Sequence, residues 1–97
     1  MKDDFKEKLL EQFPEEIDDS NMYFEMAQMA NEMNYERMAK CLFEISKDEY
    51  THAKFIHDYM VMNGICVPDD LKCKWMTLEA RAHKIYPDVP KCSYCTW

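Results

Sequence analysis

The sequence has very little glycine and proline, with one Gly (Gly64) and four Pro in 97 residues. An all-β fold needs a turn signal about every 8–12 residues, so this scarcity argues against one. The residues that dominate instead, including nine Met together with Glu, Lys, Leu and Ala, are good helix formers. The sequence therefore predicts a small all-α protein.

Basic residues are also few, since 12 Lys and Arg against 19 Asp and Glu give a formal net charge of −7. A phosphate backbone would be repelled by most of this surface, so we expect no nucleic-acid partner. No apolar run approaches the ~18 residues of a membrane span, and the first residues lack the apolar segment of a signal peptide. We therefore expect a cytoplasmic protein without membrane association.

The five cysteines make an odd set without a secreted-type disulfide framework, so we expect free thiols or metal ligands. Cys92 and Cys95 form a single Cys-x-x-Cys pair near the C-terminus. Three interpretations stay open for it: half of a zinc or iron site, a redox pair, or two thiols in a tail. The other cysteines are Cys41, Cys66 and Cys73.

The spacing of apolar residues predicts a short amphipathic helix over 5–13, which Pro14 interrupts. A long helix over 14–33 follows and ends at Asn34, because Asn tolerates the left-handed conformation found at helix ends. A second long helix is expected over 35–63. A connection this short forces the two long helices into an antiparallel hairpin.

Gly64 ends the second long helix, and a third helix is predicted over 68–86, where Pro87 stops it. We divide the chain into a helical hairpin over 1–66 and a C-terminal helix with the Cys-x-x-Cys tail over 67–97. Two neighbouring apolar stripes on the first long helix are wider than one helix contact needs. We expect a second copy of the chain to cover part of them, so that two hairpins form a four-helix bundle. The stripes are Tyr23, Ala27 and Ala30, and Met22, Met26, Met29 and Met33.

Alternating steps of four and three residues trace a seam along the second long helix, the pattern of a line that faces a neighbouring helix. Glu49 and His52 occupy its middle, where apolar residues are expected. A carboxylate there is costly to desolvate unless it is paired or binds a cation. Their i, i+3 spacing lets both side chains reach one metal ion. The seam consists of Met38, Leu42, Ile45, Glu49, His52, Ile56 and Tyr59.

The first long helix offers Glu16, which lies 18 residues before Asn34, whereas Glu49 lies 15 residues after it. In an antiparallel hairpin the two carboxylates come to similar heights. On chemistry alone, Glu15 or Asp19 are alternatives to Glu16. Two chains would supply four carboxylates and two imidazoles, a set that suits two iron or manganese ions.

These residues resemble the ferritin-like di-iron bundles, in which two helices each carry a Glu and two carry Glu-x-x-His. The rubrerythrin metal helices are similar to two segments of this chain, Glu16-x6-Tyr23 and the segment from Glu49 through His52 to Ala53. The interval of 33 residues between Glu16 and Glu49 is also the interval that the rubrerythrin family shows. The resemblance covers about residues 13–64, one half of the family's four-helix domain. Encapsulated ferritins are single-hairpin relatives that assemble a shared site.

The resemblance implies that Glu16, Glu49 and His52 bind two iron ions per dimer, with manganese or zinc as alternatives, and that Tyr23 is a hydrogen-bond donor near the metals with a catalytic role. The implied function is oxidation of Fe(II) or reduction of peroxide or O₂, with an electron-donor protein as a possible partner. Alternatives are a helical interaction module without redox activity, and an iron storage or carrier component of a larger assembly. The homodimer or a higher homo-oligomer is the implied state.

Three further features have plainer interpretations. We expect His57 to face solvent, because it lies beside the seam. His83, in the predicted third helix, could be a ligand but has no matching partner. The methionines of the first long helix are best interpreted as adaptable core or interface.

Overall fold

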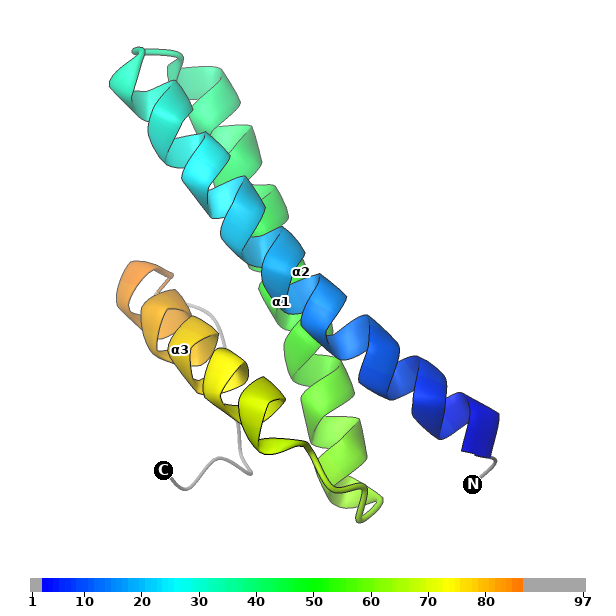
Figure 1. Ribbon diagram of the computed structural model, residues 1–97. Helices are drawn as coiled ribbons and strands as arrows, with labels where there is room; N and C mark the ends of the chain where they lie inside the picture. Colours follow the sequence, from blue (N-terminus) through cyan, green and yellow to red (C-terminus); the bar gives the residue numbers. More distant parts are fainter. Residues whose placement is uncertain (1–2, 87–97) are drawn as a thin grey trace.

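Three helices build the protein. A computed structural model describes residues 3–86, with α1 over Asp3–Glu32, α2 over Glu36–Met62 and α3 over Asp69–Ile85. Helices α1 and α2 form a long antiparallel pair, and α3 packs on one side of it (Figure 1). These residues contain no strand, which confirms the all-α prediction. None of their helices has the length and apolar character needed to cross a membrane.

The chain leaves its two long helices through left-handed backbone conformations. Asn34 has φ of 65° and Gly64 has φ of 69°. After Asn34, the amide of Tyr35 donates to the carbonyl of Ala30 at 2.9 Å, a bond that satisfies one of the free carbonyls at the end of α1. The two predicted breaks are therefore confirmed, and the ends of α2 fall within one residue of the predicted range.

The predicted break at Pro14 is wrong, because α1 continues through it and no separate helix exists over 5–13. Proline has a helical φ, so its main cost is the missing hydrogen bond to the carbonyl of Leu10 and the crowding of that carbonyl. Phe13 and Ile17, on either side, are fully buried in the core. Their packing stabilises the helical path across the proline, since tertiary contacts rather than propensity hold most helices together.

Small residues at seven-residue spacing face the contact between α1 and α2. Ser20 and Ala27 on α1 are buried, as are Ala39, Ser46 and Ala53 on α2. The hydroxyl of Ser20 donates to the carbonyl of Ser46 at 2.8 Å, and the hydroxyl of Ser46 donates to the carbonyl of Ser20 at 2.8 Å. Because this reciprocal pair satisfies both buried hydroxyls, it fixes how far one helix can slide along the other.

The residues of α2 that are buried within the chain do not form the predicted seam. They form a neighbouring row on the helix surface. Met38 and Ile45 of the seam are exposed, and Leu42 is half-buried. The prediction followed the large apolar residues, whereas the contact with α1 uses small ones. The seam is therefore left along one side of the hairpin, and the buried row consists of Ala39, Ser46, Tyr50, Ala53, His57 and Met60.

Helix α3 packs against both long helices through Trp75, which is fully buried and also contacts the ring of Phe13 on α1. The ring of Trp75 stacks on Tyr50 at 5.5 Å and 8° and on His57 at 5.1 Å and 20°. The prediction that His57 faces solvent is therefore wrong, since it is only 1% exposed beneath this ring. His83 lies at the edge of the same cluster, with its Nε2 3.4 Å from the hydroxyl of Tyr50.

Candidate metal centre

Glu16 of α1 and Glu49 and His52 of α2 come together near the middle of the hairpin. One ligand atom from each lies within 4.8 Å of the other two. Nδ1 of His52 is 3.5 Å from Oε2 of Glu16 and 3.8 Å from Oε1 of Glu49. The structure thus gathers the three side chains that the sequence singled out.

Two local features bring these side chains to one level. Glu49 and His52 lie one turn apart, so they share a face of α2. Glu16 precedes Ser20 by one turn, and Ser46 precedes Glu49 by three residues. The reciprocal Ser20–Ser46 hydrogen bonds therefore set the register that places the Glu16 carboxylate opposite the α2 pair.

The two carboxylates are largely buried, whereas the imidazole is open to solvent. The side chains of Glu16, Glu49 and His52 are 14%, 20% and 58% exposed. Gln12 donates from Nε2 to Oε1 of Glu16 at 2.8 Å, which orients the carboxylate. The other oxygen of Glu16, Oε2, is buried and accepts no well-formed hydrogen bond among residues 3–86, although Nδ1 of His52 lies 3.5 Å from it. Ionised carboxylates only accept hydrogen bonds, so a proton or a cation must satisfy this oxygen.

The carboxylates perturb one another. The hydrogen bond with Glu16, together with burial and the Glu16 charge, raises the pKa of Glu49 to about 7. Burial works to raise the pKa of Glu16 too, but hydrogen bonding with Glu49, Gln12 and His52 and the charge of His52 outweigh it, so that this pKa lies below its ordinary value. Near neutral pH the two closely spaced carboxyl groups therefore share one proton. A bound cation would take the place of this proton.

Two acids near Glu16 do not join the cluster. Glu15 and Asp19 are both exposed on α1, and Asp19 acts on Glu49 through its charge alone. Tyr23 is half-buried and lies seven residues past Glu16, about 10 Å further along α1. Its role as a donor near the metals stays a prediction.

The donor set fits a metal ion. Two carboxylates and one imidazole suit iron, manganese or zinc, and the buried, unsatisfied oxygen of Glu16 is a position that a cation would stabilise. One chain offers only three ligand residues, whereas a two-metal carboxylate site of this type uses four Glu and two His. Its most exposed ligand, His52, lies on the seam that the hairpin leaves uncovered.

The three described thiols are not part of this cluster. Cys41, Cys66 and Cys73 are exposed and free, as expected for reduced cysteines. Cys92 and Cys95 lie outside the described residues, so the three interpretations of that pair stay open.

The sequence analysis missed Gln12 and the serine pair. Gln12 lies one turn before Glu16, the spacing at which an amide can orient a carboxylate on the same helix face. The serines stand in heptad register with alanines on both helices, a pattern visible in the sequence but overshadowed by the larger apolar residues.

Comparison with known proteins agrees with this arrangement. No curated protein and no solved structure matches the chain. The family model described as the ferritin-like domain matches residues 6–84, which span all but the first few residues of α1, the whole of α2 and almost all of α3. The match covers well over half of the chain and includes each residue of the candidate metal centre, and the chain therefore belongs to the ferritin-like family.

Proposed function

We propose that this protein is a di-iron carboxylate protein whose metal site is shared by two copies of the chain. The observation that carries the proposal is the cluster of Glu16, Glu49 and His52, in which Oε2 of Glu16 is buried, accepts no well-formed hydrogen bond from the described residues, and has Nδ1 of His52 at 3.5 Å. Two copies facing each other across this cluster would supply four carboxylates and two imidazoles, the set for two iron ions. Manganese and zinc are the alternative occupants.

The residues of the chain would have distinct tasks. Gln12 orients Glu16, and Glu49 gives up the proton that it holds near neutral pH when a cation binds. His52, at the exposed edge of the cluster, would face both the metal and the second copy. Bound iron would supply the capacity to exchange electrons with O₂ or peroxide, so that Fe(II) oxidation or peroxide reduction is the proposed activity. Tyr23 is the proposed hydrogen-bond donor near the metals. We propose that the protein is cytoplasmic.

Metal content and mass in solution test this proposal. The chain is loaded anaerobically with Fe(II), and bound iron and particle mass are measured on the same sample. We expect about two irons per dimer, and iron-dependent consumption of O₂ once air is admitted. The variant Glu49→Ala should lose the two-metal site and keep its helical circular dichroism. Asp19→Ala, which removes an exposed carboxylate next to the cluster, is the matched control and should bind iron as the parent does.

The outcomes separate the proposed function from its alternatives. Unchanged iron content in the Glu49→Ala variant would sink the proposed site. Bound iron without O₂ or peroxide turnover would favour the helical interaction module. A large particle that retains many irons per chain would favour the storage or carrier function.

A further inference from the structure

A hollow lined by methionines lies at the connection end of the hairpin, and an exposed aromatic pair lies at the other end. The hollow has a volume of about 210 Å³. At the opposite end, Phe5 is 46% exposed and packs edge-on against Tyr59, with ring centroids 5.9 Å apart and an interplanar angle of 78°. We call these features the methionine hollow and the aromatic edge. The methionine hollow consists of Met26, Met29, Ala30, Met33, Tyr35, Met38 and Leu42.

The near edge of the methionine hollow and the aromatic edge lie at equal distances from the metal cluster along α2. The midpoint between Glu49 and His52 falls between residues 50 and 51, and Leu42 and Tyr59 are equidistant from it. At 1.5 Å per residue, each lies about 13 Å from that midpoint. Two α2 helices packed antiparallel across this point would therefore place Leu42 of one copy opposite Tyr59 of the other.

Helix α1 gives the same centre independently. Phe5 lies 11 residues before Glu16, and Met26 lies 10 residues after it. These separations correspond to about 16 and 15 Å along the helix, so a two-fold axis at Glu16 brings Phe5 of one copy to Met26 of the other. Both helices thus identify one axis at the level of the metal cluster.

We propose that the aromatic edge of each copy fills the methionine hollow of a second copy, so that two such contacts flank the shared metal site. The proposal rests on the proposed function, because the axis passes through the site that two copies would complete. It names the partner of that site as a second copy of this chain in one register.

The chemistry of the two surfaces is complementary. No carboxylate, ammonium or guanidinium group lines the methionine hollow, so an apolar occupant leaves no charge unpaired there. Methionine side chains adapt to irregular shapes and make favourable sulfur–aromatic contacts, which suits them to receive Phe5 and Tyr59. Because the axis is two-fold, each chain donates one aromatic edge and one hollow, and all exposed methionines of the hollow become covered.

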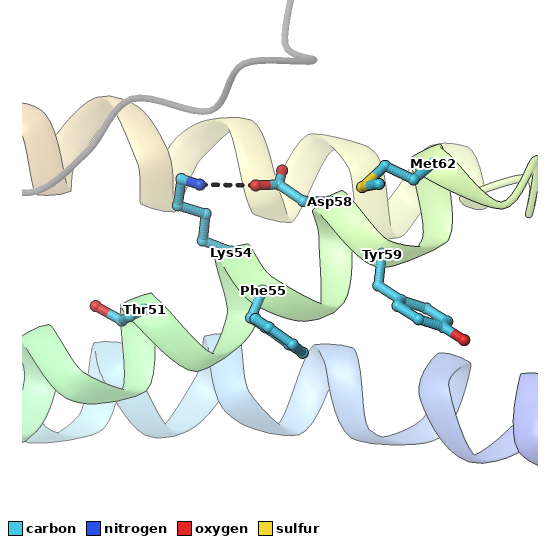
Figure 2. A pocket seen from close by; sticks show the side chains of 6 residues that line it. All are labelled: Thr51, Lys54, Phe55, Asp58, Tyr59 and Met62. Carbon is cyan, nitrogen blue, oxygen red and sulfur yellow. Dashed lines mark hydrogen bonds and ion pairs between the residues drawn. The ribbon is translucent and has the colours of Figure 1, made fainter.

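A second exposed phenylalanine provides a matched control. Phe55 is 73% exposed but lies off the seam, beside a different hollow on α2. Figure 2 shows the rings of Phe55 and Tyr59 on one side of this helix and the Lys54–Asp58 ion pair, 2.7 Å long, on the other. In the proposed register, Phe55 does not enter the methionine hollow.

Site-specific cross-linking of the full chain tests the register. Benzoylphenylalanine replaces Phe5, this chain is mixed with ¹⁵N-labelled parent protein, and cross-linked peptides are identified by mass. The expected result is links from position 5 to residues 26–42 of the labelled chain. Links from position 5 to other regions of the labelled chain, or a protein that stays monomeric at every concentration, would overturn the proposal.

Affinity and metal content complete the test. Phe5→Ala should raise the dimer dissociation constant by about tenfold or more, because two buried aromatic side chains are lost per dimer, and it should do so by more than Phe55→Ala, which removes an exposed ring that does not enter the methionine hollow. Equal effects of the two variants would contradict the docking. A dimer with the expected links that binds no iron would support the docking and refute the shared metal site. Iron at the cluster with links elsewhere would refute the docking and leave the proposed function intact.

Discussion

Replacing Glu49 by glutamine separates two consequences of the carboxylate pair, because the change should abolish metal binding and yet stabilise the metal-free protein at alkaline pH. Glu49 lies against Glu16 in a largely buried setting, and its pKa is raised to about 7. When the pH exceeds this value, both carboxylates are ionised and repel each other. Glutamine keeps the shape, can donate to the buried oxygen of Glu16, and carries no charge.

The magnitude follows from the linkage between protonation and folding. The pKa of Glu49 is about 7 in the folded chain, against an ordinary value of 4.5. At about 1.4 kcal/mol for each tenfold change in proton affinity, the difference corresponds to ~3 kcal/mol. Because this pKa is raised on folding, the stabilising contribution is fully present below pH 4.5 and is lost as pH rises through about 7. We therefore expect Glu49→Gln to raise the free energy of unfolding at pH 8 by about 1–3 kcal/mol, and by little at pH 5.

Urea unfolding of the metal-free parent and variant at pH 5, 6, 7 and 8 measures this effect. The difference between the two proteins should grow with pH, and contributions from titrating groups that do not interact with Glu49 cancel in it. Asp48→Asn is the control, since Asp48 is the exposed neighbour of Glu49 and its replacement should produce no comparable gain. A variant that is no more stable than the parent at pH 8 would refute the inference that the carboxylates repel one another.

Three further predictions concern the framework of the hairpin. Trp75→Ala should cost about 3–5 kcal/mol in urea unfolding because it removes the ring between α3 and α2, and a cost below about 1 kcal/mol would show that α3 docks by other means. Ser46→Ala should lower the free energy of unfolding by about 1–2 kcal/mol. The double variant Ser20→Ala/Ser46→Ala should lower it by less than the sum of the two single variants, because each serine bonds to the other; additive losses would contradict this coupling. Burial lowers the pKa of His57 despite the nearby Asp58 carboxylate, so stability should fall as pH drops below 6.5, and His57→Gln should flatten this slope; an unchanged slope in thermal melts from pH 7 to 5 would assign it to other groups.

Two residues of the candidate metal centre were predictable because their signal is local. Glu49 and His52 interrupt an apolar seam at a spacing that gives one helix face, and this reasoning needs no knowledge of what covers them. The length of the hairpin brought Glu16 to the level of Glu49, since Asn34 fixes where the chain reverses, but only the resemblance to the rubrerythrin spacing singled it out from Glu15 and Asp19. The course of α1 through Pro14 was not predictable in this way, because proline lowers local helix propensity and the compensating packing comes from residues far along the chain.

The position of His57 shows the same limit, since helical spacing placed it beside the seam but did not reveal that Trp75 would cover it. The sequence by itself determined the all-helical character of the chain, the two left-handed reversals and one acidic, histidine-containing face, because helix propensity, capping and periodicity act over a few residues. Tertiary structure alone decided which row of α2 faces α1 and where α3 docks. These choices depend on the fit of side chains from distant segments. The small Ser20–Ser46 contact prevailed over the larger apolar seam, of which Met38 and Ile45 stay exposed.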